Sequence, residues 1–293
     1  MSGSGRGGAL RQVMVSSVVC GGILVVGELA MRATGWPDPG LYEGDRALVW
    51  WLRPSLERTV TEPNTTRSFQ VRTTALGFRE TNPPADGDWT LAVGCSTTFG
   101  WGVEASEAWP AQLSDIWGEP VVNGGVPGWS SLQGVRGLGR LMGQENRPTR
   151  VILGFGVRDL QRSARPDAAA RATHWLHQTR WSILLRGTRT RTTLAPGTEA
   201  GVRRVSEEDV VRNLHSLVAQ VRENGAEPIL LWFPQPEGGP GEEELARLQS
   251  AFEYPPLLTP KLERSLFFPD DPIHLTPVGH RTLARWLATS IER

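Results

Sequence analysis

The sequence predicts an α/β protein, with a doubly wound and mostly parallel sheet flanked by helices and a single N-terminal transmembrane helix before it. Three observations support this fold class. Short, continuously apolar runs alternate with amphipathic helical stretches from residue 89 onward. Strands that are apolar throughout are typical of parallel sheets covered by helices on both faces. A separate apolar stretch of membrane-spanning length lies near the N-terminus.

Residues 12–31 form this apolar stretch, which only Glu28 interrupts close to its end. It is long enough to cross the hydrocarbon core of a bilayer as a helix. Arg6 and Arg11 precede it, and no acidic residue accompanies them. Because positive charge favours the cytoplasmic side, the sequence predicts a single-pass protein of the cytoplasmic membrane whose remaining chain lies on the extracytoplasmic side.

Two other interpretations of this stretch stay open. A cleaved signal peptide would release the rest of the chain as a secreted protein, although no clear Ala-x-Ala site follows the apolar run. A buried amphipathic helix would need a polar face, and none is present between Val13 and Val26. We therefore predict that residues 1–33 are a cytoplasmic tip and a membrane anchor or signal segment, with the uncleaved anchor favoured.

The rest of the chain is predicted to hold a spacer and one α/β domain. Residues 34–88 are rich in Pro, Thr, Arg and Trp and lack helical periodicity, which favours an extended spacer with short strands. Residues 89–293 carry the strand and helix alternation, and an insertion at 160–205 is expected near the functional site. The expected strands are 89–94, 119–123, 150–156 and 228–233.

Three helices are expected between and after these strands. Residues 130–143 and 207–223 place apolar side chains on one face at helical spacing. The second of these helices follows Ser206, a good cap, and stops at Asn224-Gly225. The last helix begins at Thr276-Pro277, a cap followed by proline at the first helical position.

A serine near the start of this domain and an Asp and His pair near its end form a candidate nucleophile system. Ser96 follows the first apolar strand, just after Gly94, and so lies at the carboxyl edge where open α/β sheets bind ligands. Asp271 and His274 lie just before the last helix. Ser96 would attack an acyl carbonyl, His274 would accept and return the proton, and Asp271 would orient the imidazole.

Four short blocks around these residues resemble, in the same order, the blocks of SGNH/GDSL hydrolases. They are Gly94-Cys-Ser96, Asn123-Gly-Gly-Val-Pro-Gly128, Gly156-Val-Arg-Asp159 and Asp271-Pro-Ile-His274. Upstream, Leu76-Gly-Phe-Arg79 is similar to a segment found before the first block in membrane-anchored members. The resemblance covers residues 73–293. It implies a flavodoxin-like three-layer fold, ester hydrolysis through a Ser96-His274-Asp271 triad, and no cofactor.

The resemblance also implies an oxyanion hole, at which this sequence departs from the family pattern. The hole would use the backbone N–H groups of Ser96 and Gly128 and an Asn side chain, but Arg158 stands at the Asn position and Cys95 replaces the usual Asp of the first block. Arginine is a donor and brings positive charge, so Arg158 is a candidate third donor. In the alternative, Arg158 pairs with Asp159 or another acid and leaves the hole incomplete.

Composition and residue spacing argue against several other classes of function. The 31 basic and 31 acidic residues balance, which argues against nucleic acid as a partner. His174, His177 and His215 do not show metal-ligand spacing with acidic partners, and no Cys pattern resembles a zinc site. Cys95 is disfavoured as the nucleophile because Ser96 occupies the position that the resemblance assigns to it.

The sequence therefore predicts a serine ester hydrolase that acts on an O-acyl ester of a carbohydrate or lipid outside the cytoplasmic membrane. Two alternatives stay open. One is a polysaccharide O-acyltransferase component that works beside a membrane acyltransferase partner, which the predicted anchor favours. The other is a catalytically impaired relative that binds a glycan or lipid, which the changes at Cys95 and Arg158 favour.

Overall fold

The computed structural model divides the chain into two compact units. One unit comprises residues 1–40 and 173–193, and the other comprises residues 41–172 and 194–293. The structure describes residues 5–38, 40–62, 65–163, 165–172, 179–187, 201–233, 242–253 and 255–291. His174 and His177 therefore lie outside the described residues.

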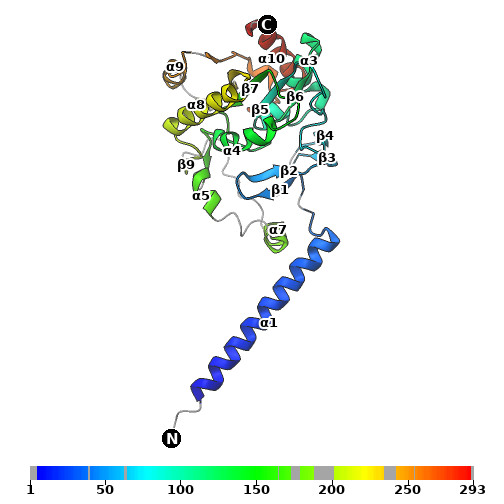
Figure 1. The fold of residues 1–293 in the computed structure, drawn as a ribbon, viewed down its shortest axis with the longest axis vertical. Coiled ribbons are helices and arrows are strands. Elements are labelled where there is room, and N and C mark those ends of the chain that lie inside the picture. The colour runs from blue at the N-terminus through cyan, green and yellow to red at the C-terminus, as the bar shows by residue number, and fades with distance from the viewer. Residues whose placement is uncertain are drawn as a thin grey trace. The chain divides into compact units, whose positions relative to one another are not determined.

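A five-stranded parallel sheet forms the centre of the second unit (Figure 1). Its order is β11-β10-β7-β5-β6, and every adjacent pair is parallel. The four strands expected from the sequence are confirmed within two residues at each end, whereas the short edge strand β11 is not predicted by the pattern. The strands are β5 (Thr90–Gly94), β6 (Val121–Asn123), β7 (Arg150–Phe155), β10 (Glu227–Trp232) and β11 (Leu257–Leu258).

The chain reverses its winding direction between β5 and β7. From β5 it moves outward to β6, and then it returns to the other side of β5 to form β7, β10 and β11. This order is the flavodoxin-like doubly wound topology, in which ligands bind at the carboxyl ends of the strands beside the reversal. Ser96, which follows β5, lies at that point of the sheet.

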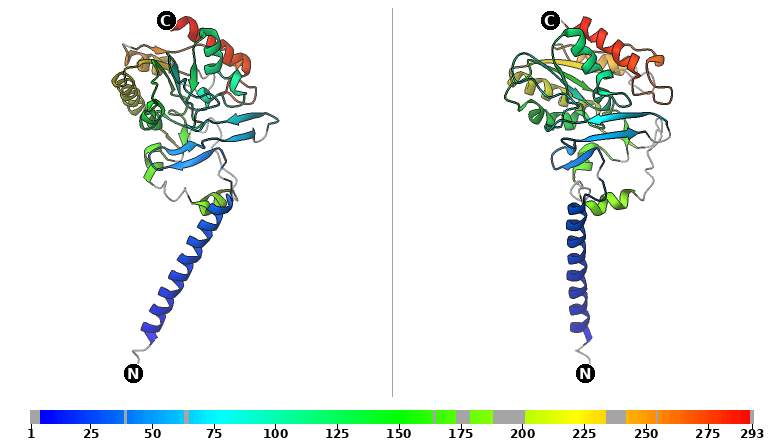
Figure 2. Two further views of the ribbon diagram at one scale, coloured as in Figure 1. Left: turned by 45° about the vertical axis from the view of Figure 1, so that its right-hand side comes forward. Right: turned by 90° about the vertical axis from the view of Figure 1, so that its right-hand side faces the viewer.

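Helices cover both faces of the sheet, which gives the three layers that the sequence predicts. α4 (Ser131–Met142) packs with α8 (Glu207–Glu223) on one face (Figure 1). α3 (Trp109–Trp117) packs with α10 (Pro277–Ser290) on the other face, as both views of Figure 2 show.

Two of these helices begin at the caps that the sequence predicts. At the start of α8, Ser206 Oγ accepts a hydrogen bond from the Asp209 N–H at 3.2 Å. At the start of α10, Thr276 Oγ1 accepts one from the Gly279 N–H at 3.1 Å. Each cap satisfies a backbone donor that has no partner inside its helix, and so fixes the residue at which the helix starts.

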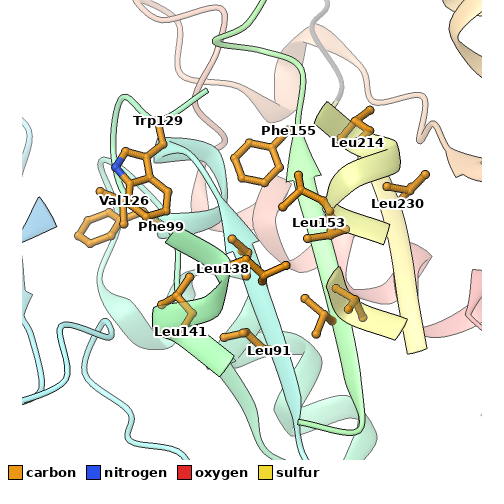
Figure 3. Close-up of a cluster of buried hydrophobic side chains, with 14 of the residues drawn as sticks. Leu91, Phe99, Val126, Trp129, Leu138, Leu141, Leu153, Phe155, Leu214 and Leu230 are labelled. Carbon is orange, nitrogen blue, oxygen red and sulfur yellow. The ribbon is translucent and has the colours of Figure 1, made fainter. Parts of the chain in front are cut away.

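Successive residues of the central strands point to opposite faces of the sheet, and both faces are buried. Leu91 and Leu153 belong to the cluster that includes Leu138 of α4 (Figure 3). Their neighbours Ala92 and Ile152 belong to the cluster formed with α3 and α10. This double burial is the physical reason why the strands read as continuous apolar runs.

Two antiparallel hairpins precede the sheet in the same unit, and their Trp51 and Phe69 are buried in the main core cluster. A further short ribbon, β8 with β9, closes the base of the insertion. The elements of this part are β1 (Tyr42–Asp45), β2 (Val49–Leu52), β3 (Glu57–Thr61), β4 (Ser68–Arg72), α2 (Ser96–Phe99), η1 (Ala105–Glu107), β8 (Arg162–Ser163), α5 (Asp167–Ala172), β9 (Val202–Arg203), α9 (Glu242–Ser250) and η2 (Arg264–Leu266).

The other unit contains α1 (Gly5–Thr34) and α7 (Arg180–Gly187). Within the described part of the chain, one helix is long and apolar enough to cross a membrane, and it spans Leu10–Thr34. Its large apolar side chains from Leu10 to Leu29 are exposed, as Val18 is at 74%, whereas Met31 is buried. That exposure is inconsistent with a buried core helix and leaves a membrane anchor or a signal sequence.

Candidate active site

Ser96 lies on a tight turn between β5 and the one-turn helix α2. Gly94 ends the strand, and an added Cβ there would lie 2.4 Å from the Gly154 carbonyl oxygen, so no side chain fits. α2 then ends at Gly100, whose φ of 81° is readily adopted only by glycine. The turn therefore presents Ser96 at the first position of α2, where the backbone N–H groups have no partners inside the helix.

Two buried side chains hold the far end of α2 in place. The guanidinium of Arg79 donates to the carbonyl oxygens of Phe99, Gly100 and Val103. Asn123 Nδ2 also donates to the Phe99 carbonyl, at 3.2 Å. Burial lowers the pKa of Arg79 to about 10, so its side chain is still charged at neutral pH. Both residues come from segments that carry the family resemblance.

His274 and Asp271 come from the loop that leads into α10. The Phe268 N–H donates to the His274 carbonyl at 3.1 Å, and the Asp271 N–H donates to the Phe268 carbonyl at 3.1 Å. Phe267 and Leu275 form an isolated antiparallel bridge across the same loop. The loop is therefore closed on itself by backbone hydrogen bonds before the helix begins.

The structure brings Ser96, His274 and Asp271 together in one chain of contacts. His274 Nε2 lies 2.8 Å from Ser96 Oγ, and His274 Nδ1 lies 2.5 Å from Asp271 Oδ2. A carboxylate only accepts, so Nδ1 carries the proton in this pairing and Nε2 accepts from the Ser96 hydroxyl. Ser96 is 1% exposed and His274 is 7% exposed, so the contacts are shielded from bulk water.

The Asp271 carboxyl stays ionised in this arrangement. Burial raises its pKa, but the hydrogen bond and charge of His274 and the backbone N–H groups of Ile273 and His274 outweigh burial. The net effect holds the pKa of Asp271 well below its usual range. An ionised acceptor at this position favours the Nδ1–H tautomer of His274 and would stabilise an imidazolium.

Arg158 follows β7 and points its guanidinium at the candidate nucleophile. Its Nη2 donates to Ser96 Oγ at 3.3 Å, and its Nη1 donates to Gln161 Oε1 at 2.8 Å. No ion pair joins Arg158 to a carboxylate among the described residues. Burial lowers the pKa of its guanidinium.

Asp159, the acid that the sequence offers as an ion-pair partner for Arg158, binds other groups. Its carboxylate accepts hydrogen bonds from the Ser131 N–H at 2.8 Å and from the Gly156 N–H at 3.1 Å. Burial raises the pKa of this carboxyl. Asp159 therefore joins the turn after β7 to the first residue of α4 and leaves the Arg158 guanidinium free to face Ser96.

Gly128 lies in a tight turn that follows β6. The Trp129 N–H donates to the Val126 carbonyl at 3.1 Å, Pro127 occupies the second position, and Gly128 has a φ of 87°. These features fit a type II turn, in which the N–H of the third residue takes no part in the turn hydrogen bond. No hydrogen bond engages the Gly128 N–H within the described part of the chain.

Side chains from distant parts of the chain hold both carbonyl groups that flank this N–H. Trp50 Nε1, from the β1–β2 hairpin, donates to the Pro127 carbonyl at 3.1 Å. Arg204 Nη2, at the base of the insertion, donates to the Gly128 carbonyl at 2.8 Å. Asp167 accepts from Arg204 at 2.9 and 2.8 Å through its two oxygens. The turn is thus held from two sides.

In the part of the chain that the structure describes, several further side chains make no hydrogen bond to Ser96, His274 or Asp271. Cys95 is buried, with Sγ 3.1 Å from Thr97 Oγ1. The aromatic Trp129 is fully buried and donates to the Trp50 carbonyl at 3.1 Å. His215 is exposed and stacks on Phe252. Among the described residues, no group of three His, Cys, Asp or Glu side chains could hold a metal ion.

Sequence reasoning misses Trp50, Gln161 and Arg204. Trp50 falls in the stretch interpreted as an extended spacer, and Gln161 and Arg204 fall at the two ends of the insertion. No local motif marks them, because each acts on a residue of another segment. The four tryptophans between residues 36 and 89 were the available signal, since so much aromatic surface is unusual in a solvated linker.

Comparison with known proteins assigns the sequence to a family. The sequence pattern of the GDSL-like lipase/acylhydrolase family matches residues 92–282. Thioesterase 1/protease 1/lysophospholipase L1 of Escherichia coli (strain K12) is 35% identical over 85 residues, which cover 28% of this chain and 40% of that protein. The chain thus matches well under two thirds of the length of this curated relative.

Two solved structures are similar to this chain over 70% of its length. A G-D-S-L family protein from Desulfitobacterium hafniense DCB-2 is 16% identical, with a TM-score of 0.47 and coverage of 70% of this chain and 100% of that one. The psychrotrophic esterase EstA from Pseudoalteromonas sp. is 16% identical, with a TM-score of 0.44 and coverage of 70% and 96%. Because the family pattern spans well over half of the sequence, the protein belongs to the GDSL-like lipase/acylhydrolase family, whose members are hydrolases acting on ester bonds.

Proposed function

We propose that this protein is a serine ester hydrolase in which Ser96 is the nucleophile, His274 the general base and acid, and Asp271 the group that orients His274. The observation that carries the proposal is the 2.8 Å contact between Ser96 Oγ and His274 Nε2, with Asp271 on the opposite ring nitrogen. A hydroxyl paired in this way is the activated nucleophile of acyl transfer. The proposed substrate is an O-acyl ester of a carbohydrate or lipid.

The proposed reaction has two halves. Ser96 Oγ attacks the acyl carbon while His274 Nε2 takes the hydroxyl proton, and the resulting imidazolium is stabilised by Asp271. His274 then gives that proton to the departing alkoxide, which leaves an acyl-Ser96 ester. Water, deprotonated by His274, attacks this ester, and His274 returns the proton to Ser96 Oγ as the acyl–Oγ bond breaks, so the products are a carboxylic acid and an alcohol.

The oxyanion hole is proposed to consist of the Ser96 N–H, the Gly128 N–H and the Arg158 guanidinium. In a planar trans peptide the N–H points away from the C=O, so the Trp50 bond to the Pro127 carbonyl aims the Gly128 N–H in the opposite direction. The position of Arg158 beside Ser96, and the absence of a carboxylate partner for it among the residues that the structure describes, support its role as the third donor. We therefore favour a complete hole over an impaired one.

Hydrolysis of short p-nitrophenyl esters by the full chain in detergent tests the proposal. The Ser96→Ala variant is expected to lose at least about 10³-fold in kcat/KM, because the nucleophile is gone. A fluorophosphonate probe is expected to label the native chain and not the variant. Equal hydrolysis by both proteins would refute the serine mechanism. Absence of labelling of the native chain would favour the ligand-binding alternative.

We further propose that α1 stays attached and anchors the hydrolase on the extracytoplasmic side of the cytoplasmic membrane. Arg6 and Arg11 before the apolar stretch support this orientation. The contacts of α1 with α7 support retention over cleavage, because Glu28 accepts hydrogen bonds from the backbone N–H groups of Arg180 and Trp181. Cleavage after α1 would leave the start of α7 without these acceptors.

The apolar helix α1 also favours a second candidate, an O-acyltransferase component that receives acyl groups from a membrane partner. The acyl-Ser96 ester would then be attacked by a glycan hydroxyl in place of water. Product analysis separates the two. Recovery of free carboxylic acid alone, with a glycan acceptor present, supports the hydrolase, and acylated glycan supports the transferase.

A further inference from the structure

The helix α7 is held by its first turn against the last third of α1. Glu28 Oε2 accepts a hydrogen bond from the Arg180 N–H at 2.8 Å, and Oε1 accepts one at 3.0 Å. The Arg180 guanidinium donates to the Pro37 carbonyl just beyond α1. Arg32 pairs with the same Glu28 carboxylate at 2.7 Å. The only acidic residue in the apolar stretch is therefore bound by Arg32 of α1 and by the backbone N–H groups at the start of α7.

Trp181 completes this contact. Its indole Nε1 donates to the Leu24 carbonyl at 2.9 Å. An added Cβ at Gly27 would lie 2.5 Å from Trp181 Cζ2, so the ring packs on the bare backbone of α1 at this glycine. The neighbouring Gly22, in contrast, has nothing within 4 Å. Leu24, Gly27 and Glu28, on one side of α1, contact the first turn of α7.

These contacts fix the position of α7 along the length of α1. At about 1.5 Å per residue, the apolar stretch of residues 12–31 spans ~30 Å, the thickness of the hydrocarbon core. Gly27 lies about one turn before the end of that span, which is the level of the boundary between acyl chains and headgroups. Trp is the residue that favours this boundary, because its ring is apolar and its N–H is polar.

We propose that α7 lies in the plane of the membrane surface, with its apolar side in the outer leaflet that α1 crosses. This inference rests on the membrane attachment proposed above. Leu184 and Leu185 follow Trp181 at helical spacing on one side of α7, and Leu185 is 64% exposed. An exposed leucine beside an interfacial tryptophan, on a helix docked to an apolar span, is suited to contact with lipid. The partner is a phospholipid surface.

Depth-dependent quenching in liposomes tests the proposal on the full chain. A Cys20→Ser background removes the exposed thiol, and Cys95 is buried. An environment-sensitive fluorophore is then placed by Leu185→Cys, by Val19→Cys within the span, and by Ile116→Cys on α3 as an exposed apolar reference. Two lipids are compared, one with its quencher near the headgroup and one with its quencher near the bilayer centre. We expect the first to quench the fluorophore at position 185 at least about twofold more strongly than the second.

The reference positions separate the possible outcomes. Position 19 is expected to respond most to the deep quencher, and position 116 to neither. If position 185 is as unresponsive as position 116 while position 19 is quenched, the placement of α7 is wrong and the anchor stands. If position 19 is also unresponsive, the anchor itself fails and the placement fails with it.

A pair of glycine variants tests whether the α1 contact sets the depth. Gly27→Leu would clash with the Trp181 ring and is expected to lower shallow quenching at position 185 by about twofold or more. Gly22→Leu has open space and is the matched control, expected to leave quenching at position 185 unchanged. Quenching at position 19 reports whether either variant still inserts. Equal effects of the two variants would contradict the docking role of Gly27.

Discussion

At the scale of single residues, Arg158 is the departure from the family pattern that lies against the candidate nucleophile. Its guanidinium faces Ser96 Oγ at 3.3 Å while Gln161 holds the other terminal nitrogen at 2.8 Å. An amide at this position would offer a neutral dipole, whereas Arg158 offers a full charge and a planar pair of donors. A positive charge placed where negative charge develops stabilises it more strongly when water is excluded from the site.

The kinetics of Arg158 variants test its role as an oxyanion donor. Arg158→Ala is expected to lower kcat by about 10²–10³-fold with little change in KM, because the interaction forms only in the transition state. Arg158→Asn, which restores an amide donor, is expected to retain or raise activity. Steady-state hydrolysis of p-nitrophenyl esters measures both. A fully active Arg158→Ala beside an inactive Arg158→Asn would contradict the role.

Trp50→Phe tests whether the aim of the Gly128 N–H matters. The change keeps an aromatic ring but removes the indole donor to the Pro127 carbonyl. We expect kcat to fall on the order of 10-fold at similar KM, less than the 10²–10³-fold cost of removing a donor outright. Trp89→Phe is the matched control, since Trp89 Nε1 also donates to a carbonyl, that of Asn146. Equal loss in both variants would point to general destabilisation.

The lowered pKa of Asp271 predicts a pH dependence of stability. An unfolded Asp titrates near 3.9, and the folded pKa lies below that value, so the carboxylate stabilises the folded state above about pH 4. This contribution is lost as pH falls through the folded pKa. The difference in Tm between the native chain and Asp271→Asn is expected to be largest near neutral pH and to shrink below pH 4. A constant difference would show that ionisation is not the cause.

Local sequence reveals the residues that perform the proposed chemistry but not the ones that hold them. Ser96, Asp271 and His274 stand in short motifs. In each motif, residues adjacent in the sequence are enough to predict the turn or the helix cap. Trp50 and its partner Pro127 are 77 residues apart, and Arg204 is 76 residues from Gly128. Contacts of this kind depend on how the hairpin, the sheet and the insertion pack together. The local spacing of apolar residues does not predict that packing.

At the scale of elements, the strands and helices of the sheet could be predicted because each has a strong pattern of its own. The four central strands are continuously apolar, and α8 and α10 carry clear caps. β11 escapes prediction because an edge strand of two residues has no pattern to read. Short strands are predicted within residues 34–88, but their pairing into the β1–β2 and β3–β4 hairpins is not, since their aromatic side chains lie among turn-forming residues.

The small helix α2 depends on one long-range cation. Arg79 satisfies three buried carbonyl groups of residues 99–103. Arg79→Leu would keep apolar volume and leave the Gly100 and Val103 carbonyls without this donor, whereas the Phe99 carbonyl keeps the bond from Asn123, so the free energy of unfolding is expected to fall by about 3 kcal/mol. Chemical denaturation measures the change. Fluorophosphonate labelling of Ser96 is expected to slow as well, and unchanged stability would rule out the structural role of this side chain.

At the scale of the whole molecule, one unit is assembled from segments far apart in the chain. The insertion leaves the α/β unit at α5, contributes α7 to the unit that holds α1, and returns at β9. The sequence predicts the anchor and the insertion separately, because each has its own composition. Their association could not be predicted, since it rests on Glu28 and Gly27 meeting the first turn of α7.

Retention of α1 is the prediction that belongs to this scale. Because Leu24 and Glu28 accept hydrogen bonds from α7, we expect the protein recovered from membranes to keep these residues. Mass spectrometry of the intact chain, after alkaline washing of the membranes, measures this. A soluble chain that begins beyond Pro37 would show instead that the segment is a cleaved signal.

The turn at Gly128 has one more consequence, which concerns the free energy needed to reorient dipoles when negative charge develops. In water, dipoles must reorient around a developing anion, and that reorientation is part of the activation barrier. Here the carbonyl on each side of Gly128 is already tied to Trp50 or Arg204 before any substrate arrives. Folding completes the reorientation once, so each catalytic cycle would meet a donor that is already aimed.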